Sequence, residues 1–551
     1  SFTARGHRNL LSPVTSATEI CHFDDASKQF DTERLFPLIT GNFHIEANYK
    51  NPFSIPAKNA PKIAVTSNSP LQGNGFSFQR RQFIVEIGNF YRIQAEENGI
   101  QYPVYEEHGR KNFPDSHSPV LGSWDDEDWD EYFRYIFSCV SKYLSKGLPL
   151  GGESEIYQKA KLISEIGSEE ILEFIIEKLE TFEGKKVHAH SLYMFRDKDD
   201  KKIVDVNSIS SGVNIGSIQF DDIKKIQNSL KKNNDDEWSK TAVIKRSTIL
   251  NKVADLIEKD PYELIFYLIN EAGKTIQNAI DEIREGIDFL RYYSEQAKEI
   301  IQEKDLDGPT GEDNKIYYSP KGKFLCISPW NFPVAILIGQ ISAALACGNK
   351  VIIKPSEHTS ILGYLVIKKF HESGVPISCL ELILGDGKYG EALTQVSLLD
   401  GVAFTGSLPT AKKIQSNLIQ YQDQIIHLIA ETGGINTMLV DSSALLEQVT
   451  DDVVRSAFDS AGQRCSALRI LCIQEEIYED LVEMIKGNMS VQKIGDPNEF
   501  DTDIGPIIST EATKKLNNYI EECKKEGLDV FQSSEPSEKN YISPTLISIN
   551  K

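Results

Sequence analysis

Between residues 241 and 551, short apolar runs alternate with longer stretches that have helical spacing. The apolar runs predict strands at Phe324–Ile327, Lys350–Ile353, Glu381–Leu384 and Gly401–Phe404. Strands separated by helices of ten or more residues form βαβ units, which place the strands parallel in one sheet. We therefore expect an α/β fold for this part of the chain.

The chain before residue 241 has a different pattern. Residues 1–150 mix strand-like runs, at Lys62–Thr66 and Phe83–Ile87, with an acidic and aromatic-rich helical stretch at Trp124–Leu144. Residues 151–240 are expected to be helical and then polar. At 551 residues the chain is long enough for several domains, and the change in pattern predicts that the first third is a separate one.

Composition narrows the class of protein. A net charge of −22 argues against a general nucleic-acid-binding surface. Eight scattered cysteines show neither zinc-site spacing nor a disulfide framework, which favours a reducing, cytoplasmic location. The longest apolar run, Phe332–Cys347, contains Gln340 and has Pro333 in its first turn, so we interpret it as a buried helix and not a membrane span.

Polar or glycine-rich turns follow all four predicted strands. Trp330 and Asn331 follow the first strand, and the cation Lys354 ends the second, before a carboxylate suited to ribose hydroxyls at Glu357. Glycines follow the third and fourth strands, within Gly385–Gly387 and Thr405–Ser407. Open α/β sheets bind ligands at the carboxyl ends of their strands, where glycine lets the backbone approach a pyrophosphate. One such turn is most simply a plain connection, but four in succession predict a binding edge.

Cys465 is the candidate nucleophile. Its neighbours in Phe458–Arg469 are Gly, Gln, Arg and Ser, which do not form an apolar core strand. The simpler interpretation of a lone cysteine is a small buried hydrophobe, and we assign that role to Cys472 in its apolar run. A nucleophilic thiolate needs a base and an oxyanion donor, which Glu431 and Asn331 would supply.

Long motifs in the right order carry a family resemblance. They are Gly308–Asn314, Ile327–Pro333, Ala430–Gly434, Val440–Leu445 and Phe458–Arg469. On these motifs, residues from about 188 to 551 resemble the aldehyde dehydrogenase superfamily. The resemblance is strongest to its 1-pyrroline-5-carboxylate dehydrogenases, including the module of that kind in bifunctional proline-utilisation enzymes.

The resemblance implies a fold and a reaction. A Rossmann-like NAD-binding domain would occupy 241–430 and a partial catalytic domain 431–551, with a linker and the start of the dehydrogenase at 181–240. Cys465 would attack L-glutamate γ-semialdehyde, Asn331 and the Cys465 backbone N–H would stabilise the oxyanion, and Glu431 would activate water for thioester hydrolysis to L-glutamate. The cofactor NAD would contact Ile327, Trp330, Lys354, Glu357, Gly387, Thr405, Gly406, Ser407 and Gly433.

Glu357 favours NAD over NADP, because a 2′-phosphate would meet its charge. Other features depart from the family. The chain stops near Ser543–Leu546, before the Glu-x-Phe-Gly-Pro segment, the substrate-anchoring loop and the oligomerisation strand of the family. We therefore expect exposed apolar surface around Ile542–Ile549 and leave the oligomeric state open. The region Asn207–Trp238 is short, so we also expect an early strand pair to be missing.

The N-terminal third carries a second resemblance. A strand ending in Asp24 and Asp25 would present carboxylates for Mg²⁺, a second strand ends near Asn68, and Arg80 and Arg81 follow. Residues of about 15–180 resemble the later half of a superfamily 3 phage- or plasmid-type primase-helicase, which implies a partial P-loop-type ATPase domain at 1–180. Nucleic acid would bind only through this part. The simpler interpretation is a surface strand end and a solvated arginine pair.

Three functions stay open on the sequence. One is the dehydrogenase, the second is an ATP-driven nucleic-acid motor, and the third is a composite chain with neither activity. The phosphate-binding loop Gly-x-x-x-x-Gly-Lys-Ser/Thr is absent from the chain. Its absence and the net charge favour the dehydrogenase over the motor.

Overall fold

The computed structural model describes residues 169–193, 202–232, 237–534 and 540–549, and short strands at 2–3, 20–24, 43–45, 53–55 and 62–65. The chain divides into two compact units, Ser1–Ser77 with Ile156–Lys551, and Phe78–Glu155. All described residues belong to the first unit. Within these described ranges, no helix is long and apolar enough to cross a membrane.

The N-terminal strands form two small sheets. β1 (Phe2–Thr3), β2 (Ile20–Asp24) and β5 (Lys62–Val65) are parallel, in the order β1-β2-β5. β3 (Phe43–Ile45) and β4 (Phe53–Ile55) pair antiparallel. The strands expected before Asp25 and at Lys62–Thr66 are thus confirmed. The helicase-like interpretation stays a prediction, because its other residues, Asp25, Asn68, Arg80 and Arg81, lie outside the described residues.

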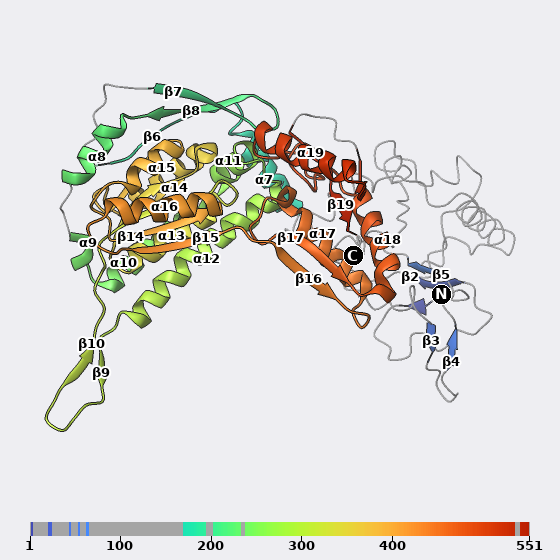
Figure 1. Ribbon diagram of the computed structural model, residues 1–551, viewed down its shortest axis with the longest axis horizontal. Coiled ribbons are helices and arrows are strands. Elements are labelled where there is room, and N and C mark those ends of the chain that lie inside the picture. The colour runs from blue at the N-terminus through green and yellow to red at the C-terminus, as the bar shows by residue number, and fades with distance from the viewer. Residues whose placement is uncertain are drawn as a thin grey trace, which may run out of the picture. The chain divides into compact units, whose positions relative to one another are not determined.

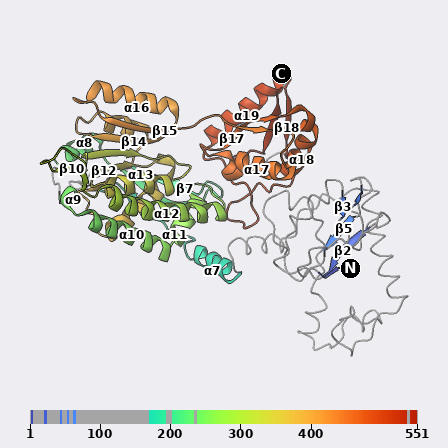
Figure 2. The same ribbon diagram turned by 90° about the horizontal axis from the view of Figure 1, so that it is seen from below.

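The centre of the dehydrogenase-like part is a five-stranded parallel sheet in the order β13-β12-β11-β14-β15. Its strands β12, β14 and β15 are labelled in Figure 2. All four predicted strands are confirmed within a few residues. The sheet consists of β11 (Lys323–Ile327), β12 (Lys350–Lys354), β13 (Leu380–Leu382), β14 (Gly401–Gly406) and β15 (His427–Thr432). β12 and β13 lie on one side of β11, and β14 and β15 lie on its other side. The direction of the crossovers therefore reverses between β11 and β14. Ligands bind at such a switch point in open α/β sheets.

Alternate residues of the strands enter two hydrophobic cores, one on each face of the sheet. Cys326 and Ile353 belong to the core formed with α10 (Val243–Lys259), α11 (Tyr262–Asn270), α12 (Ile276–Ile300), α13 (Ala335–Ala346) and α14 (Ser360–Glu372). Leu325 and Ile352 belong to the other core, with α8 (Ile223–Lys232), α15 (Gly387–Thr394) and α16 (Leu408–Tyr421). Burial on both faces explains why the strands are continuous apolar runs.

Helix α13 confirms the expected buried helix. It begins at Ala335, after Pro333, because proline has no backbone N–H for a helix interior. The amide of Gln340, the polar residue in this run, donates to the hydroxyl of Thr405 at 3.0 Å. It therefore ties α13 to the end of β14.

Strands at 187–220 correct two expectations. β6 (Val187–His190), β8 (Asn214–Phe220) and β7 (Lys202–Asn207) form a sheet in that order, with β7 and β8 as an antiparallel pair. The prediction that an early strand pair is missing was therefore wrong, and residues 151–240 are not simply helical and then polar. β7 contains three β-branched apolar residues, Ile203, Val204 and Val206, so the sequence did carry a strand signal, although the side chains of this strand are mostly exposed. The buried positions lie in β8, including Ile215 and Ile218.

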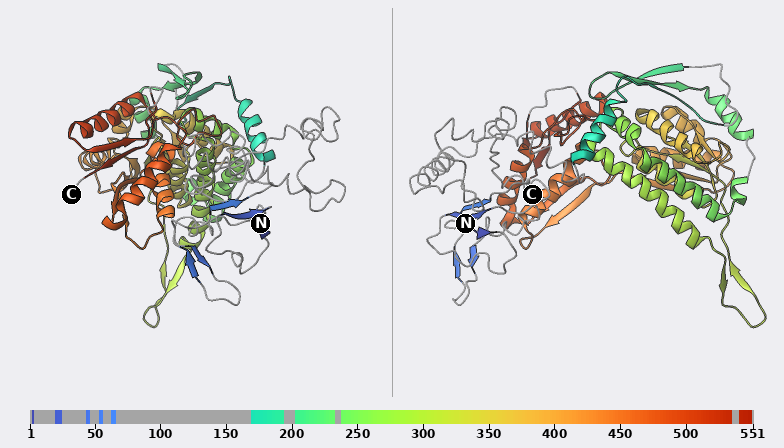
Figure 3. Two further views of the ribbon diagram at one scale, coloured as in Figure 1. Left: turned by 90° about the vertical axis from the view of Figure 1, so that its right-hand side faces the viewer. Right: turned by 180° about the vertical axis from the view of Figure 1, so that it is seen from behind.

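Helices and a hairpin complete this half. α7 (Glu169–Glu180) precedes β6, α9 (Glu237–Lys240) precedes α10, and α10 packs along α12, as the right-hand view of Figure 3 shows. The antiparallel hairpin of β9 (Lys304–Leu306) and β10 (Asn314–Ile316) follows α12 and projects away from the sheet (Figure 1).

The C-terminal part contains two two-stranded sheets. β16 (Asn436–Val440) and β17 (Leu468–Ile473) are parallel, and α17 (Leu446–Phe458) and α18 (Tyr478–Ser490) cover one of their faces. β18 (Asp529–Gln532) and β19 (Thr545–Ser548) are antiparallel and follow α19 (Thr510–Lys525). Short 3₁₀ helices lie at Glu357–Thr359, Asp459–Gly462 and Glu475–Ile477.

Cys472 is exposed, so the prediction that it is buried was wrong. It lies on the same face of the β16–β17 sheet as Leu439 and Ile470, opposite the face that α17 and α18 cover. The apolar pattern of β17 predicted the strand correctly but could not show that only one face is covered.

Exposed apolar surface is present, but mostly away from the expected place. Ile549 is 78% exposed, in the range predicted. More lies on the edge strand β15, where Ile429 is 55% exposed, and on the open face of β16 and β17, where Leu439 is 78% exposed. These side chains are adjacent to unpaired strand edges, which favour association.

We expect lysine substitution of Ile429 and Leu439 to reduce binding of a hydrophobic fluorescent dye, because the charge interrupts these two surfaces. The matched control is Ile244→Lys, since Ile244 is 67% exposed but lies on the surface of α10. Equal dye fluorescence in all variants would show that these strands do not form the dye-binding surface.

Candidate active site

The turn between β11 and α13 presents Trp330 and Asn331. Its end is held by Glu282, a buried carboxylate of α12, whose Oε1 accepts the backbone N–H groups of Val334 at 2.7 Å and Ala335 at 3.2 Å. These are the first free N–H groups of α13. The helix therefore begins with its positive end already neutralised by a protein carboxylate.

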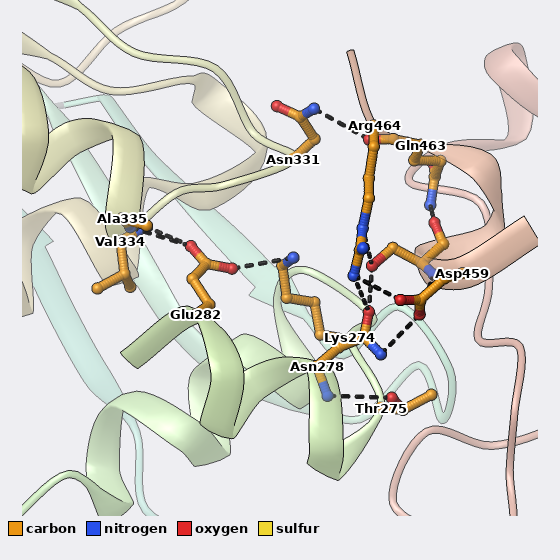
Figure 4. A network of polar contacts seen from close by, with 11 residues as sticks. Lys274, Thr275, Asn278, Glu282, Asn331, Val334, Ala335, Asp459, Gln463 and Arg464 are labelled. Carbon is orange, nitrogen blue, oxygen red and sulfur yellow. Dashed lines mark hydrogen bonds and ion pairs between the residues drawn. The ribbon is translucent and has the colours of Figure 1, made fainter. Parts of the chain in front are cut away.

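Asn331 connects this turn to the segment that carries Cys465. Its amide Nδ2 donates to the backbone carbonyl of Gln463 at 2.9 Å (Figure 4). Gln463 is fixed in turn, because its Oε1 accepts from the Ile508 backbone N–H at 2.9 Å. Asn331 therefore contacts the backbone two residues before Cys465, although these two predicted catalytic residues are 134 positions apart in numbering.

The backbone before Cys465 is strained. Ser460, Ala461 and Gly462 have φ angles of 53°, 56° and 67° in succession. Left-handed conformations are uncommon for residues with a Cβ, and they persist only where surrounding contacts enforce them. A Cβ on Gly462 would lie 2.7 Å from the Ala457 carbonyl oxygen, so glycine is required there.

A polar network supplies those contacts (Figure 4). The carboxylate of Asp459 pairs with Arg464 at 2.8 Å and accepts from Asn278 Nδ2 at 2.9 Å. Arg464 donates to the Asn278 side-chain oxygen at 3.1 Å and to the Ser460 hydroxyl at 3.2 Å. Asn278 belongs to α12, so this network attaches the Cys465 segment to the same helix that holds the Asn331 turn.

Cys465 itself is exposed, and its backbone carbonyl accepts from Asn436 Nδ2 at 2.8 Å. Exposure makes the thiol accessible, in contrast to the buried Cys326, where burial raises the pKa to about 12. Accessibility is a requirement for a nucleophilic cysteine.

Lys354 and Glu357 form a pair in the turn after β12. The Lys354 ammonium lies 3.7 Å from the Glu357 carboxylate and donates to the Pro355 carbonyl at 3.0 Å. Burial lowers the pKa of Lys354, while Glu357 and Asp386 oppose that shift. Lys354 is buried and Glu357 is exposed, so the pair presents a carboxylate to solvent beside a fixed cation.

A second buried carboxylate holds the helix after this turn. Glu271, at the end of α11, accepts the backbone N–H groups of Ile361 and Leu362 in the first turn of α14, both at 2.9 Å. Burial raises the pKa of Glu271 to about 8, although these N–H groups favour the ionised form.

The four helices that follow the strands differ in how they begin. Carboxylates cap three of them: Glu282 on α13, Glu271 on α14 and Asp386 on α15. The cap of α16 is the neutral hydroxyl of Ser407, which is exposed. Carboxyl groups therefore already accept the free N–H groups of α13, α14 and α15, whereas α16 is capped by a neutral hydroxyl.

Glu431 and Gly433 lie at the other side of the Thr405–Ser407 turn. In the register of β14 and β15, Glu431 is opposite Thr405 and Thr432 is opposite Gly406. Glu431 is exposed. The expected cofactor residues Ile327, Trp330, Lys354, Glu357, Thr405, Gly406, Ser407 and Gly433 all lie at or just after the ends of β11, β12, β14 and β15, with Gly387 after β13.

Sequence reasoning missed the supporting residues Lys274, Asn278, Glu282 and Asp459. Lys274, Asn278 and Glu282 belong to the turn before α12 and to α12 itself, so no local motif connects them to Asn331 or Cys465. Asp459 lies within the Phe458–Arg469 motif, which assigned it no role. The one signal was a charged residue at an otherwise buried helix position, at Glu282. Among the described residues, no cluster of His, Cys, Asp or Glu is suited to a metal ion.

The model of the aldehyde dehydrogenase family matches residues 195–550. The chain belongs to this family. The match includes the whole five-stranded sheet and the Cys465 segment. It begins near the expected start at about 188 and leaves the N-terminal third outside.

Known relatives agree with this assignment. The chain is 44% identical over 324 residues to the bifunctional protein PutA of Salmonella typhimurium, covering 57% of this chain and 24% of that protein. It is 30% identical over 354 residues to the 1-pyrroline-5-carboxylate dehydrogenase of Oceanobacillus iheyensis, covering 63% of this chain and 69% of that protein. The chain thus spans about a quarter of the length of the PutA relative.

A solved structure has the same fold. Proline utilization A from Bdellovibrio bacteriovorus, inactivated by N-propargylglycine, matches with a TM-score of 0.65 and 27% identity, over 68% of this chain and 40% of that one. The aldehyde dehydrogenase fold expected from the motifs is therefore confirmed.

We expect Glu271 to make stability depend on pH. Its pKa is raised from 4.5 to about 8 in the folded chain, so the folded state holds a proton that the unfolded state has released. The free energy of unfolding then falls as pH rises between about 4.5 and 8 and is level above that window. Glu271→Gln cannot ionise, so its stability relative to the wild type should rise with pH. Chemical unfolding at about pH 5 and pH 8 measures this, and a constant difference would contradict it.

Proposed function

We propose that this chain carries the NAD-dependent dehydrogenase activity that oxidises L-glutamate γ-semialdehyde, formed from 1-pyrroline-5-carboxylate, to L-glutamate. The observation that carries the proposal is the hydrogen bond from Asn331 Nδ2 to the Gln463 carbonyl, two residues before Cys465. This bond ties an amide donor to the backbone of the segment that carries the exposed Cys465 thiol, and the same segment contains left-handed residues at Ser460 and Ala461. The names of the relatives supply the substrate class.

The reaction uses the residues as follows. The Cys465 thiolate forms a bond to the aldehyde carbon, and the oxygen that becomes negative is stabilised by the Asn331 amide and the Cys465 backbone N–H. Loss of a hydride, with its two electrons, from the carbon bonded to Cys465 leaves a thioester, and the residues at the strand ends would hold the nicotinamide cofactor that supplies the hydride acceptor. Glu431 takes a proton from water, and the water oxygen bonds to the acyl carbon as the C–S bond breaks, which releases the acid and restores the Cys465 thiolate.

The cofactor site fits NAD in three respects. The neutral cap of α16 leaves the Thr405–Ser407 turn open to a pyrophosphate. Lys354 pairs with Glu357, and the exposed Glu357 carboxylate would suit two ribose hydroxyls better than a 2′-phosphate. We propose NAD on these grounds, and a cytoplasmic location and a small-molecule aldehyde partner with it.

Removal of the thiol tests the proposed reaction. We expect the chain to form NADH from NAD and 1-pyrroline-5-carboxylate, and Cys465→Ala to lower kcat by at least ~1,000-fold, because no covalent intermediate can form. The matched control is Cys472→Ala, since Cys472 is also an exposed cysteine, and its kcat should stay within about twofold. Absence of NADH formation by folded wild-type chain would contradict the proposal, as would equal rates in both variants.

Glu357 tests the cofactor. Glu357→Gln should raise kcat/KM with NADP by roughly tenfold relative to NAD, because the repulsion of the 2′-phosphate is removed. Glu372→Gln is the control, since Glu372 lies at the far end of α14 and pairs with Lys368. If both variants keep the wild-type ratio of NAD to NADP efficiency, Glu357 does not determine cofactor choice.

A further inference from the structure

Two buried carboxylates hold the two turns on which the proposed reaction depends. Glu282 accepts from the first N–H groups of α13, which follows Asn331, and Glu271 accepts from those of α14, which follows Lys354 and Glu357. Both carboxylates come from the helices packed beneath the turns, not from the turns themselves. They do not belong to the residues that the family motifs point to.

The contacts of Glu282 continue to the catalytic side of the turn. Its Oε2 pairs with the Lys274 ammonium at 2.9 Å, and the side chains of both residues are almost fully buried, at 0% and 5% exposed. The same ammonium lies 4.3 Å from the ring centroid of Phe332, the residue after Asn331. The Lys274–Glu282 ion pair therefore contacts the turn at two places: Lys274 at the Phe332 ring, and Glu282 at the first N–H groups of α13.

We propose that Glu282, with Lys274, is a positioning residue for Asn331, and that Glu271 is the matching positioning residue for the Lys354–Glu357 turn. This inference rests on the proposed function for its kinetic readout. The two roles differ because each carboxylate accepts N–H groups of a different helix, and each of these helices begins directly after one of the two turns. Loss of the Glu282 contact should impair the chemical step, and loss of the Glu271 contact should impair NAD binding.

The alternative is that both carboxylates serve stability alone. A buried charge left without its partner destabilises a protein strongly, so a single substitution of Glu282 would confound the two roles. Replacing Lys274 as well removes that problem. Lys274→Met keeps an apolar contact to Phe332 through a thioether.

The decisive pair is therefore Lys274→Met/Glu282→Gln and Lys274→Met/Glu282→Leu. Neither holds an unpaired charge, but only the Gln variant keeps an oxygen for the N–H groups of Val334 and Ala335. We expect kcat of the Leu variant to be at least about tenfold below that of the Gln variant, with KM for NAD equal within about twofold, since small displacements of a catalytic group cost large factors in rate.

Glu271→Gln should show the opposite pattern. Both oxygens of Glu271 accept an N–H, and the amide NH₂ of Gln cannot accept, so one contact of α14 is lost. We expect KM for NAD to rise about fivefold or more with a smaller change in kcat. Val253→Ala, at a buried position of α10, is the control for destabilisation alone. It should change neither kcat nor KM for NAD.

Hydrogen exchange gives a readout that needs no turnover. The Glu282→Leu double variant should exchange faster than its Gln partner in peptides covering 331–340, and Glu271→Gln should exchange faster than wild type in peptides covering 357–366. If the wild-type chain does not turn over, the proposed function fails, and exchange together with calorimetric NAD binding still decides the positioning. Equal exchange within each pair, or equal losses of kcat and NAD affinity in every variant, would overturn it.

Discussion

Parallel hydrogen bonding in register across β13-β12-β11-β14-β15 decides where the chemistry of this chain can lie. Because all five strands run the same way, the turns that carry Asn331, Glu357 and Ser407 emerge at one edge. The strand order reverses between β11 and β14, so Thr405 and the Asn331 turn flank the switch point. The Cys465 segment joins that edge through one amide and one polar network. A change in the register of these strands would therefore displace all of these groups from one another at once.

Charge at helix ends adds a second level of organisation. Each helix after a strand offers free N–H groups that favour an anion. Protein carboxylates occupy three of the four ends, and two of these, Glu271 and Glu282, are buried and come from α11 and α12. The fourth end, that of α16, is capped by the neutral hydroxyl of Ser407.

The sequence predicted much of the fold and of the site for a physical reason. Strands buried on both faces are continuous apolar runs, and the turns after them need glycine, proline and polar residues, so β11 to β14 were recognisable. Strands with one exposed face were harder: β7 is mostly exposed, and Cys472 was wrongly expected to be buried. The contacts of Asn278 with Asp459 and of Glu282 with Val334 could not be predicted, because they join residues far apart in the chain.

The proposed catalysis requires a covalent acyl intermediate on Cys465, at the edge where Asn331 and Glu431 lie. Acid quenching of a Glu431→Gln variant mixed with NAD and 1-pyrroline-5-carboxylate, followed by peptide mass spectrometry, tests it most directly, because slow thioester hydrolysis lets the intermediate accumulate. The account predicts a glutamyl mass increase on the Cys465 peptide that appears only when NAD is present. An unmodified Cys465 peptide alongside NADH formation, or the acyl group on another residue, would contradict it.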